Sequence, residues 1–316
     1  MTKIFIDGSA GTTGLQIRER LAARKDIEIL QIEEDKRKDI DARLSFMNDA
    51  DIAFLCLPDE SAKEIVKYID KDKIDIKIID TSTAHRTVDG WVYGFAELGL
   101  EKDIKNSKRI ANPGCHATGF ISIVFPLIKS GIISSDEHLS CFSLTGYTGG
   151  GKKMIESYES MRLDKEKLES PGIYGLNMQH KHLKEMQKIC GLKFAPSFCP
   201  IVTDFPRGMA TSVTFNGAQV NGNYKLSNII EAFNEFYASS NLIKVVDNTT
   251  DPLKHTTLYA NEKAETDALD IVISGTQENF VITALFDNLG KGACGAAIQN
   301  MNILMNAPMY EGLKID

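Results

Sequence analysis

The sequence predicts an α/β chain in which a doubly wound parallel sheet is joined to an α+β domain with a mainly antiparallel sheet. Three observations support this prediction. Short apolar runs alternate with helical patterns as far as Cys115, the first of these runs leads into a glycine-rich turn, and strand patterns dominate the rest of the chain. Alternating strands and helices are typical of a parallel sheet covered on both faces.

The first strand, Lys3–Asp7, leads into the glycine turn Gly8–Gly14, and a helix is expected from Leu15 to about Arg24. Strand, glycine turn and helix in this order are the setting of a Rossmann-like dinucleotide fingerprint. The glycines let a pyrophosphate approach the backbone, and the helix N-terminus stabilises its charge. The spacing is G-x-x-G-x-x-G rather than G-x-G-x-x-G. A tight strand-to-helix turn without a ligand is the alternative.

The charged run 33–38 follows the second predicted strand, Ile27–Ile32, and supports three interpretations. Glu34 lies about 20 residues beyond the last glycine of the turn, where an acidic residue bonds the ribose hydroxyls of NAD. Lys36 and Arg37 are suited instead to the 2′-phosphate of NADP. A solvated charge run is the third interpretation.

Two more apolar runs, 51–57 and 76–80, have the composition of buried parallel strands, and a helix is expected at 61–69. The polar segment Thr81–Arg86 follows the second of these runs. Ligands of open α/β sheets bind beyond the carboxyl ends of the strands. This segment therefore belongs to a candidate binding site.

Cys115 follows the turn residues Asn112, Pro113 and Gly114, and an apolar run at helical spacing begins at Phe120. The cysteine is thus expected where a tight turn enters a helix. Amide N–H groups and the helix dipole at such a position favour a thiolate, which is the nucleophilic form. This setting suits covalent chemistry at a carbonyl carbon. A buried structural cysteine is the alternative.

Beyond the helix expected at 120–129, the pattern becomes that of an α+β domain. Strands are expected at 139–145, 194–203, 210–220, 243–246, 271–274 and 280–286. Helices are expected at 152–160, 180–190 and 226–239, a loop at 164–179, and a final helix from the 287–293 segment to about Met305.

Three polar clusters lie at the boundaries of these elements. Gly146–Lys152 joins a strand to a helix and offers backbone N–H groups to an anion, or is a flexible connector. His180 and His182 lie near a helix start; on a helix they point about 200° apart, so that only one faces the thiol, whereas in an extended segment they share a face. Arg207 lies in a Pro-Gly turn between two strands, as a rigidly presented ligand or as a surface arginine.

Composition excludes several classes of protein. With 316 residues the chain is long enough for two domains, and its net charge of −7 argues against partners such as nucleic acids or anionic membranes. No apolar run is long enough to span a bilayer. The six cysteines show neither metal-site nor disulfide spacing. We therefore expect a cytoplasmic protein without a metal.

Taken together, these motifs resemble those of the N-acetyl-γ-glutamyl-phosphate reductase family, in its shorter second type, which is related to the aspartate-semialdehyde dehydrogenases. The resemblance covers essentially the whole chain. It rests on the segments Gly8–Gly14, Ser82–Thr87, Trp91–Phe95, Ala111–Cys115, Gly149–Lys152, His180–His182, Arg207–Met209 and Asp287–Ala293.

The resemblance implies the NADPH-dependent reduction of an acyl phosphate to an aldehyde through a cysteine thioester. Cys115 is then the nucleophile and His182, the second histidine of its pair, the acid and base, while His116 is expected to point away. Arg86 holds the transferring phosphate and Arg207 the α-carboxylate. The remaining substrate-binding residues are Asn112, Lys152 and His180.

The resemblance also implies where the cofactor and the partners bind. The NADP-binding domain comprises residues 1–115 and 287–316, and the catalytic, substrate-binding and oligomerisation domain comprises residues 116–286. The chain is expected to form a homodimer or homotetramer. The cofactor-binding residues are Gly8, Ser9, Ala10, Gly11, Thr12, Thr13, Gly14, Ser82, Asn288 and Gly290. An aspartyl or amino-adipyl phosphate reductase, or a cofactor-binding sensor, are the rival functions.

Overall fold

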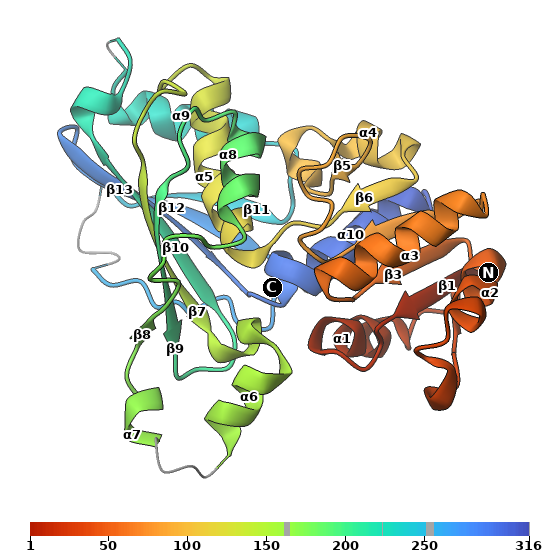
Figure 1. Cartoon of the computed structure of the whole chain (residues 1–316). Helices are drawn as coiled ribbons and strands as arrows, with labels where there is room; N and C mark the ends of the chain where they lie inside the picture. The colour runs from red at the N-terminus through yellow and green to blue at the C-terminus, as the bar shows by residue number, and fades with distance from the viewer. Residues whose placement is uncertain (161–164, 223, 251–255, 316) are drawn as a thin grey trace. The chain divides into compact units, whose positions relative to one another are not determined.

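A computed structural model describes residues 1–160, 165–222, 224–250 and 256–315 (Figure 1). The chain divides into two compact units. The first comprises residues 1–114 and 293–313, and the second comprises residues 115–292 with the C-terminal residues from Lys314.

The first unit contains a six-stranded sheet in the order β2-β1-β3-β4-β6-β5, in which every neighbouring pair is parallel. Its strands are β1 (Thr2–Asp7), β2 (Ile27–Leu30), β3 (Ile52–Leu55), β4 (Lys77–Asp80), β5 (Val92–Tyr93) and β6 (Arg109–Ala111). Its helices are α1 (Thr12–Leu21), α2 (Ile40–Asp49), α3 (Asp59–Lys71), α4 (Glu101–Asn106) and α10 (Gly295–Leu304).

Helices cover both faces of this sheet. Ile17 of α1 and Met301 of α10 belong to the core on one face. Met47 of α2 and Ile65 of α3 belong to the core on the other. The strands are therefore buried on both sides, which explains their continuous apolar sequences. The prediction of a doubly wound parallel sheet is confirmed.

The second unit contains a seven-stranded sheet in the order β11-β12-β13-β10-β7-β9-β8. The pairs β7–β9 and β11–β12 are parallel, and the others are antiparallel. Its strands are β7 (Ser140–Gly146), β8 (Gly172–Ile173), β9 (Ser197–Thr203), β10 (Met209–Asn216), β11 (Ile243–Asp247), β12 (Leu269–Gly275) and β13 (Asn279–Phe286). Its helices are α5 (Cys115–Lys129), α6 (Lys152–Glu159), α7 (Lys165–Leu168), α8 (Leu183–Cys190) and α9 (Leu226–Phe236). The mainly antiparallel sheet is thus confirmed.

Helix α5 is the central helix of the second unit. It packs on β10 and β13 and is flanked by α8 and α9 (Figure 1). The approach to the sheet is close at Gly119, where an added Cβ would lie 2.5 Å from Thr211 and 2.9 Å from the Phe286 ring. Glycine therefore sets the depth at which α5 rests on the sheet.

A buried polar network anchors the first turn of α5 to the sheet. His116 is buried, and its Nδ1 and Nε2 lie 2.7 Å from the hydroxyl oxygens of Ser143 and Tyr174, respectively. Ser143 in turn bonds Thr211 on the adjacent strand. Burial lowers the pKa of His116 to about 3, with a smaller contribution from His180 and Lys181. This imidazole is therefore neutral at physiological pH.

Several local predictions were wrong. The predicted loop 164–179 contains α7 and β8, although residue 164 lies outside the described residues. The strand predicted at 210–220 ends at Asn216, because the Asn216 side chain accepts the Ala218 N–H and starts a 3-10 turn. The helix predicted at 180–190 begins at Leu183. Helices α2 and α4 were not predicted.

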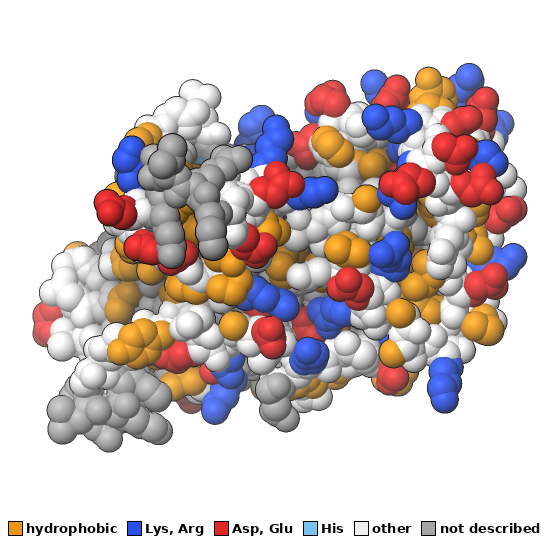
Figure 2. All heavy atoms as spheres, turned by 90° about the horizontal axis from the view of Figure 1, so that it is seen from below, with side chains coloured by type: hydrophobic (Ala, Val, Ile, Leu, Met, Phe, Trp, Pro, Cys, Tyr) orange, Lys and Arg blue, Asp and Glu red, His pale blue; other side chains and the backbone are white. Residues whose placement is uncertain are grey.

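Within the described residues, no helix combines the length and apolar character needed to cross a bilayer. Figure 2 shows basic side chains interspersed with acidic ones over the face in view. On this face, therefore, the charges do not gather into a basic surface of the kind that binds nucleic acid.

We expect Gly119→Ala to destabilise the protein by about 1–3 kcal/mol, because the new methyl group overpacks the contact of α5 with Thr211. Urea unfolding measures the change. Asn234→Ala, at an exposed position of α9, is the control and should change stability by less than about 0.5 kcal/mol. Equal stabilities of Gly119→Ala and wild type would contradict the close packing.

We expect stability to fall as pH is lowered from 6.5, the ordinary pKa of histidine, toward about 3, the pKa of His116 in the fold. In this window the unfolded chain binds a proton that the folded chain does not, so stability increases with pH. His116→Asn should reduce the slope of unfolding free energy against pH. The exposed His138→Asn is the control; equal slopes in both variants would exclude His116 as the source.

Candidate active site

The turn between β1 and α1 is closely packed at two of its glycines. Gly8 has φ +87°, and a Cβ there would lie 2.3 Å from the Cys56 carbonyl oxygen. A Cβ on Gly14 would lie 2.4 Å from the Gly8 carbonyl oxygen, whereas one on Gly11 would have ordinary contacts. Gly8 and Gly14 thus serve the close packing of the turn, and Gly11 lies at its exposed edge.

The start of α1 is suited to the pyrophosphate of a dinucleotide. Gly11 is the N-cap residue and supplies no side-chain cap, and the first turn contains no acidic residue. Ser9, Thr12 and Thr13 are partly exposed beside it, and Ala10 is exposed. Backbone N–H groups and the helix dipole favour an anion at this position. The predicted cofactor residues 8–14 therefore fit the group they were assigned.

The charged run after β2 is paired within itself. Lys36 Nζ lies 2.6 Å from Glu33 Oε2, and Arg37 Nη1 lies 3.5 Å from Glu34 Oε1. Arg37 also has a buried Nε without a hydrogen-bond partner among the described residues. Since Glu33 and Glu34 are each opposed by a base of the same turn, these two acids present little net charge to a ribose.

The segment Thr81–Arg86 is held by Asp80, a fully buried residue at the end of β4. The Asp80 carboxylate accepts hydrogen bonds from the backbone N–H and the hydroxyl of Ser82, at 2.9 and 2.8 Å. Its Oδ2 also lies 2.6 Å from His85 Nδ1, and the His85 ring stacks on Trp91. The loop that carries Arg86 is therefore rigidly built.

Arg86 is tied to the chain just ahead of Cys115. Its Nε donates to the Asn112 carbonyl oxygen at 2.9 Å, and its Nη2 donates to the Thr81 carbonyl oxygen at 3.1 Å. The Asn112 side chain is buried; it donates to the Ala293 carbonyl oxygen and accepts from Asn300. Asn112 thus holds the turn, and Arg86 presents a guanidinium beside it.

Cys115 is the first residue of α5 and is half-buried, while the residues on both sides of it are buried. The expected turn-to-helix setting is therefore present. Burial and, to a smaller extent, the electrostatic influence of Cys115 raise the pKa of Tyr174. The Tyr174 hydroxyl, which bonds His116, accordingly lies in the electrostatic environment of the sulfur.

Three histidines of the second unit form one cluster. The ring centroid of His116 lies 5.5 Å from that of His180 and 5.7 Å from that of His182, and the latter two are 4.8 Å apart. His116 thus lies in the same cluster as the pair His180 and His182. Of the two alternatives for His180 and His182, the helical one does not apply, because both residues precede α8.

The environments of His180 and His182 differ. The His182 backbone N–H donates to His180 Nδ1 at 3.3 Å, and burial lowers the pKa of His180 to about 4. His180 is thus a neutral acceptor that shapes the start of α8. His182 is buried, and its Nε2 lies 3.9 Å from Oε1 of the buried Glu185. A carboxylate beside an imidazole orients it and stabilises its protonated form.

Arg207 lies between β9 and β10, and its Nε is 2.9 Å from Oδ2 of the fully buried Asp287. Asn288 and Gly290, predicted to contact the cofactor, belong to the second unit; the chain returns to the first unit only at Ala293. The Asn288 side chain bonds Gly208 and Thr148, so it holds loops of its own unit. Lys152 is the exposed first residue of α6.

Three residues in these contacts had received no role from the sequence. Tyr174 lay within the predicted loop and gave no signal. Glu185 carried a weak signal, since it lies three residues after His182 where a helix was expected. Asp287 is the first residue of the motif Asp287–Ala293, but the sequence indicated no partner for its carboxylate. These three residues make contacts with residues distant in sequence or in turns, and sequence periodicity does not predict such contacts.

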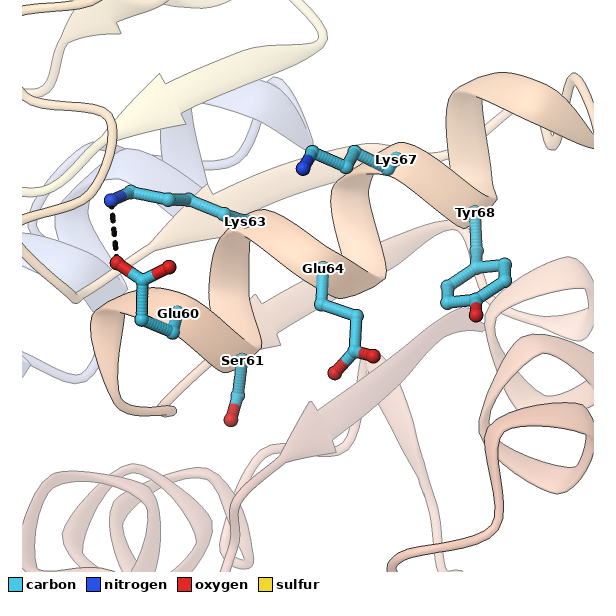
Figure 3. A pocket seen from close by; sticks show the side chains of 6 residues that line it. All are labelled: Glu60, Ser61, Lys63, Glu64, Lys67 and Tyr68. Atoms are coloured by element: carbon cyan, nitrogen blue, oxygen red, sulfur yellow. Dashed lines mark hydrogen bonds and ion pairs between the residues drawn. The ribbon is translucent and has the colours of Figure 1, made fainter.

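A surface hollow of about 480 Å³ lies along α3, lined by Glu60, Ser61, Lys63, Glu64, Lys67 and Tyr68 (Figure 3). Its lining is polar, and it shares no residue with the groups described above. Among the described residues, no group of three or more His, Cys, Asp or Glu has the arrangement of a metal site. None of the six cysteines, all of them within the described residues, forms a disulfide.

Two family descriptions match the chain. "Semialdehyde dehydrogenase, NAD binding domain" matches residues 3–107, and "Semialdehyde dehydrogenase, dimerisation domain" matches residues 115–288. Among solved structures, aspartate semialdehyde dehydrogenase from Francisella tularensis has a TM-score of 0.73 at 15% identity, covering 96% of this chain and 100% of that one. The enzyme from Candida albicans, solved with NADP, has a TM-score of 0.66 at 14% identity, covering 96% and 99%. These neighbours confirm the fold.

Curated relatives are much closer in sequence. N-acetyl-gamma-glutamyl-phosphate reductase 2 of Nostoc sp. is 40% identical, covering 98% of this chain and 99% of the relative. N-acetyl-gamma-glutamyl-phosphate reductase of Brucella ovis is 41% identical, covering 96% and 98%. The two domains and this full-length similarity together confirm the resemblance found in the motifs: the chain belongs to the N-acetyl-γ-glutamyl-phosphate reductase family of semialdehyde dehydrogenases.

Proposed function

We propose that the chain reduces N-acetyl-L-glutamyl 5-phosphate to N-acetyl-L-glutamate 5-semialdehyde with NADPH and releases phosphate, as a step of arginine biosynthesis. The observation that carries this proposal is a half-buried cysteine at the first residue of α5, in the same unit as a histidine–carboxylate pair. A nucleophile at a helix start and an oriented base are the groups that acyl transfer requires.

In this proposal the Cys115 thiolate attacks the acyl-phosphate carbonyl carbon. The C–S bond forms as the bond to phosphate breaks, and the product is a thioester on Cys115. Backbone N–H groups of the first turn of α5 stabilise the oxyanion that develops during the attack. NADPH, when bound, supplies the hydride that reduces the thioester carbon. The resulting thiohemiacetal then releases the aldehyde and regenerates the thiolate.

His182 takes the thiol proton of Cys115 and later protonates the thiohemiacetal oxygen. Support comes from its buried position beside Glu185 and from the neutral state of its two neighbours, His116 and His180, whose pKa values are lowered to about 3 and about 4. An imidazole whose charged form is stabilised works as both base and acid near neutral pH.

Two arginines hold the anionic groups of the substrate. Arg86 binds the transferring phosphate, and Arg207 binds the α-carboxylate, each through a planar guanidinium that matches its anion. Lys152, His180 and Asn112 are the other substrate-binding residues of this proposal. Ser82 and the 8–14 turn contribute to cofactor binding in the first unit.

We further propose a cytoplasmic homodimer or homotetramer. Cysteines without disulfides suit a reducing compartment. Self-association through the sheet of the second unit is supported by the match to a dimerisation domain and by the exposure of Phe142 on β7 and Ile173 on β8.

The reaction run in reverse tests the function. N-acetylglutamate semialdehyde, phosphate and NADP should generate NADPH, measured by its absorbance. Aspartate semialdehyde in its place should support little turnover. Equal or faster turnover with aspartate semialdehyde, or none with either aldehyde, would refute the proposal.

We expect Cys115→Ser to abolish turnover while fold and NADPH binding are retained, since a hydroxyl is a far weaker nucleophile at neutral pH. Iodoacetamide should label Cys115 first, because burial raises the pKa of Cys56, Cys141 and Cys190, and acyl phosphate should protect it. A serine variant with more than a few per cent of wild-type activity would exclude the thioester route.

We expect His182→Asn to remove the limb of the pH–rate profile near neutrality and to lower kcat by about 10²–10⁴. His180→Asn and His116→Asn should keep that limb, because both residues are already neutral there. The profile of kcat against pH in the three variants checks this. Loss of the limb in His180→Asn, with His182→Asn active, would reverse the assignment.

We expect a preference for NADPH over NADH. Glu33 and Glu34 are opposed by Lys36 and Arg37, and Arg37 has an unused buried donor for the 2′-phosphate; Thr12 and Thr13 are further contacts. Arg37→Ala should reduce the ratio of kcat/KM values for the two cofactors. Lys38→Ala, its exposed neighbour, should not. A wild-type ratio that favours NADH would show that the acidic residues select the cofactor.

A further inference from the structure

The turn after β13 buries a carboxylate whose role no motif assigned. Asp287 is fully buried. Its Oδ1 accepts hydrogen bonds from the backbone N–H groups of Leu289 and Gly290, at 2.7 and 2.9 Å. Its Oδ2 accepts a hydrogen bond from the backbone N–H of Glu265. A buried carboxylate is costly unless hydrogen bonds and an opposite charge compensate it. The hydrogen bonds come from the backbone, and the opposite charge comes from Arg207.

Asp287 contacts one edge of the Arg207 guanidinium. Asp287 Oδ2 lies 2.9 Å from Arg207 Nε. The two atoms form an ion pair, but the N–H group does not point at the oxygen well enough to form a hydrogen bond. The Arg207 side chain is 24% exposed. A guanidinium is planar and presents donors along more than one edge. With Asp287 at Nε, the two Nη groups remain to meet a second anion.

The backbone that carries Arg207 is also held in place. Gly208 has φ +127°, and its N–H donates to Asn288 Oδ1 at 2.9 Å. The Asn288 Nδ2 donates to Thr148 Oγ1 at 2.9 Å, and that hydroxyl donates to the Pro206 carbonyl oxygen at 2.6 Å. Arg207 is thus restrained at both its main chain and its guanidinium.

The same turn touches the nucleophile. The Gly292 N–H donates to the Asp287 carbonyl oxygen at 3.0 Å, and a Cβ on Gly292 would lie 3.0 Å from the Cβ of Cys115. Residues 287–292 therefore contact Cys115 at one end and Arg207 at the other, within the second unit. A substrate with its carbonyl at Cys115 would have this turn beside it.

We propose that Asp287 is a positioning residue that orients Arg207 toward the substrate and thereby selects acyl phosphates carrying a second, carboxylate anion. The inference rests on the proposed function, in which Arg207 binds that carboxylate. Asp287 contacts neither the reacting atoms nor the substrate. It neutralises Arg207 in the absence of substrate and sets the plane of its guanidinium.

The test compares two acyl phosphates, N-acetylglutamyl phosphate and butyryl phosphate, which lacks the carboxylate. Asp287→Asn should raise KM for the first about tenfold, with kcat less affected and with kcat/KM for butyryl phosphate unchanged. Arg207→Ala should lower kcat/KM for N-acetylglutamyl phosphate by at least about thirtyfold. The double variant should be no worse than Arg207→Ala. Asp270→Asn is the control: it breaks the ion pair between Lys263 Nζ and Asp270 Oδ2, which are also 2.9 Å apart. It should leave kcat and KM unchanged for both substrates.

The inference would be overturned if Asp287→Asn lowered kcat/KM equally for both substrates. It would also be overturned if the reductions in kcat/KM of the two single variants added up in the double variant. If Asp287→Asn does not fold, Arg207→Lys decides, because lysine keeps the charge but not the planar edges. Arg207→Lys should raise KM for N-acetylglutamyl phosphate by about the same factor that is expected for Asp287→Asn. A KM near the wild-type value would refute the orienting role. A wild-type enzyme that does not reduce N-acetylglutamyl phosphate would refute the proposed function instead, independently of any variant.

Discussion

The close contact of α5 with the β10–β13 pair is the constraint on which the second unit depends. Gly119 permits it, Thr211 and Phe286 form its floor, and the contact fixes where the first turn of the helix lies. That turn contains Cys115 and His116. A side chain placed by a buried helix has little freedom to move, so the groups that we propose act with Cys115 must be brought to it. In this proposal the strands, the histidine cluster and the turn at 287–292 all do so.

Protonation is divided among neighbouring imidazoles by their surroundings. His116 is enclosed between Ser143 and Tyr174, and desolvation keeps it neutral. His180 accepts a backbone N–H and is likewise neutral. His182 alone of the three has a carboxylate beside it, at 3.9 Å. Similar side chains thus lie in different environments, and the two neutral rings place no positive charge beside His182.

The sequence predicted the parallel sheet, the mainly antiparallel sheet and the turn before Cys115, because these depend on local periodicity and turn chemistry. It did not predict that His116 joins His180 and His182, since the segment at 180–182 reaches α5 through tertiary packing. Tyr174 and Asp287 were missed for the same reason: their partners, His116 and Arg207, are far away in sequence. The sequence therefore predicted which residues lie in the candidate site, but not the contacts between residues from distant segments.

A chain of net charge −7 cannot attract anionic ligands such as a dinucleotide or an acyl phosphate by its overall field. The anion sites that we propose are local instead. The start of α1 offers backbone dipoles, and Arg86 is held by carbonyl oxygens. Arg207 is opposed by Asp287, which cancels much of its charge beyond a Debye length of about 8 Å. Such a site discriminates among anions at contact distance, by the direction of its donors, and this suits an enzyme that must distinguish among acyl phosphates of similar charge.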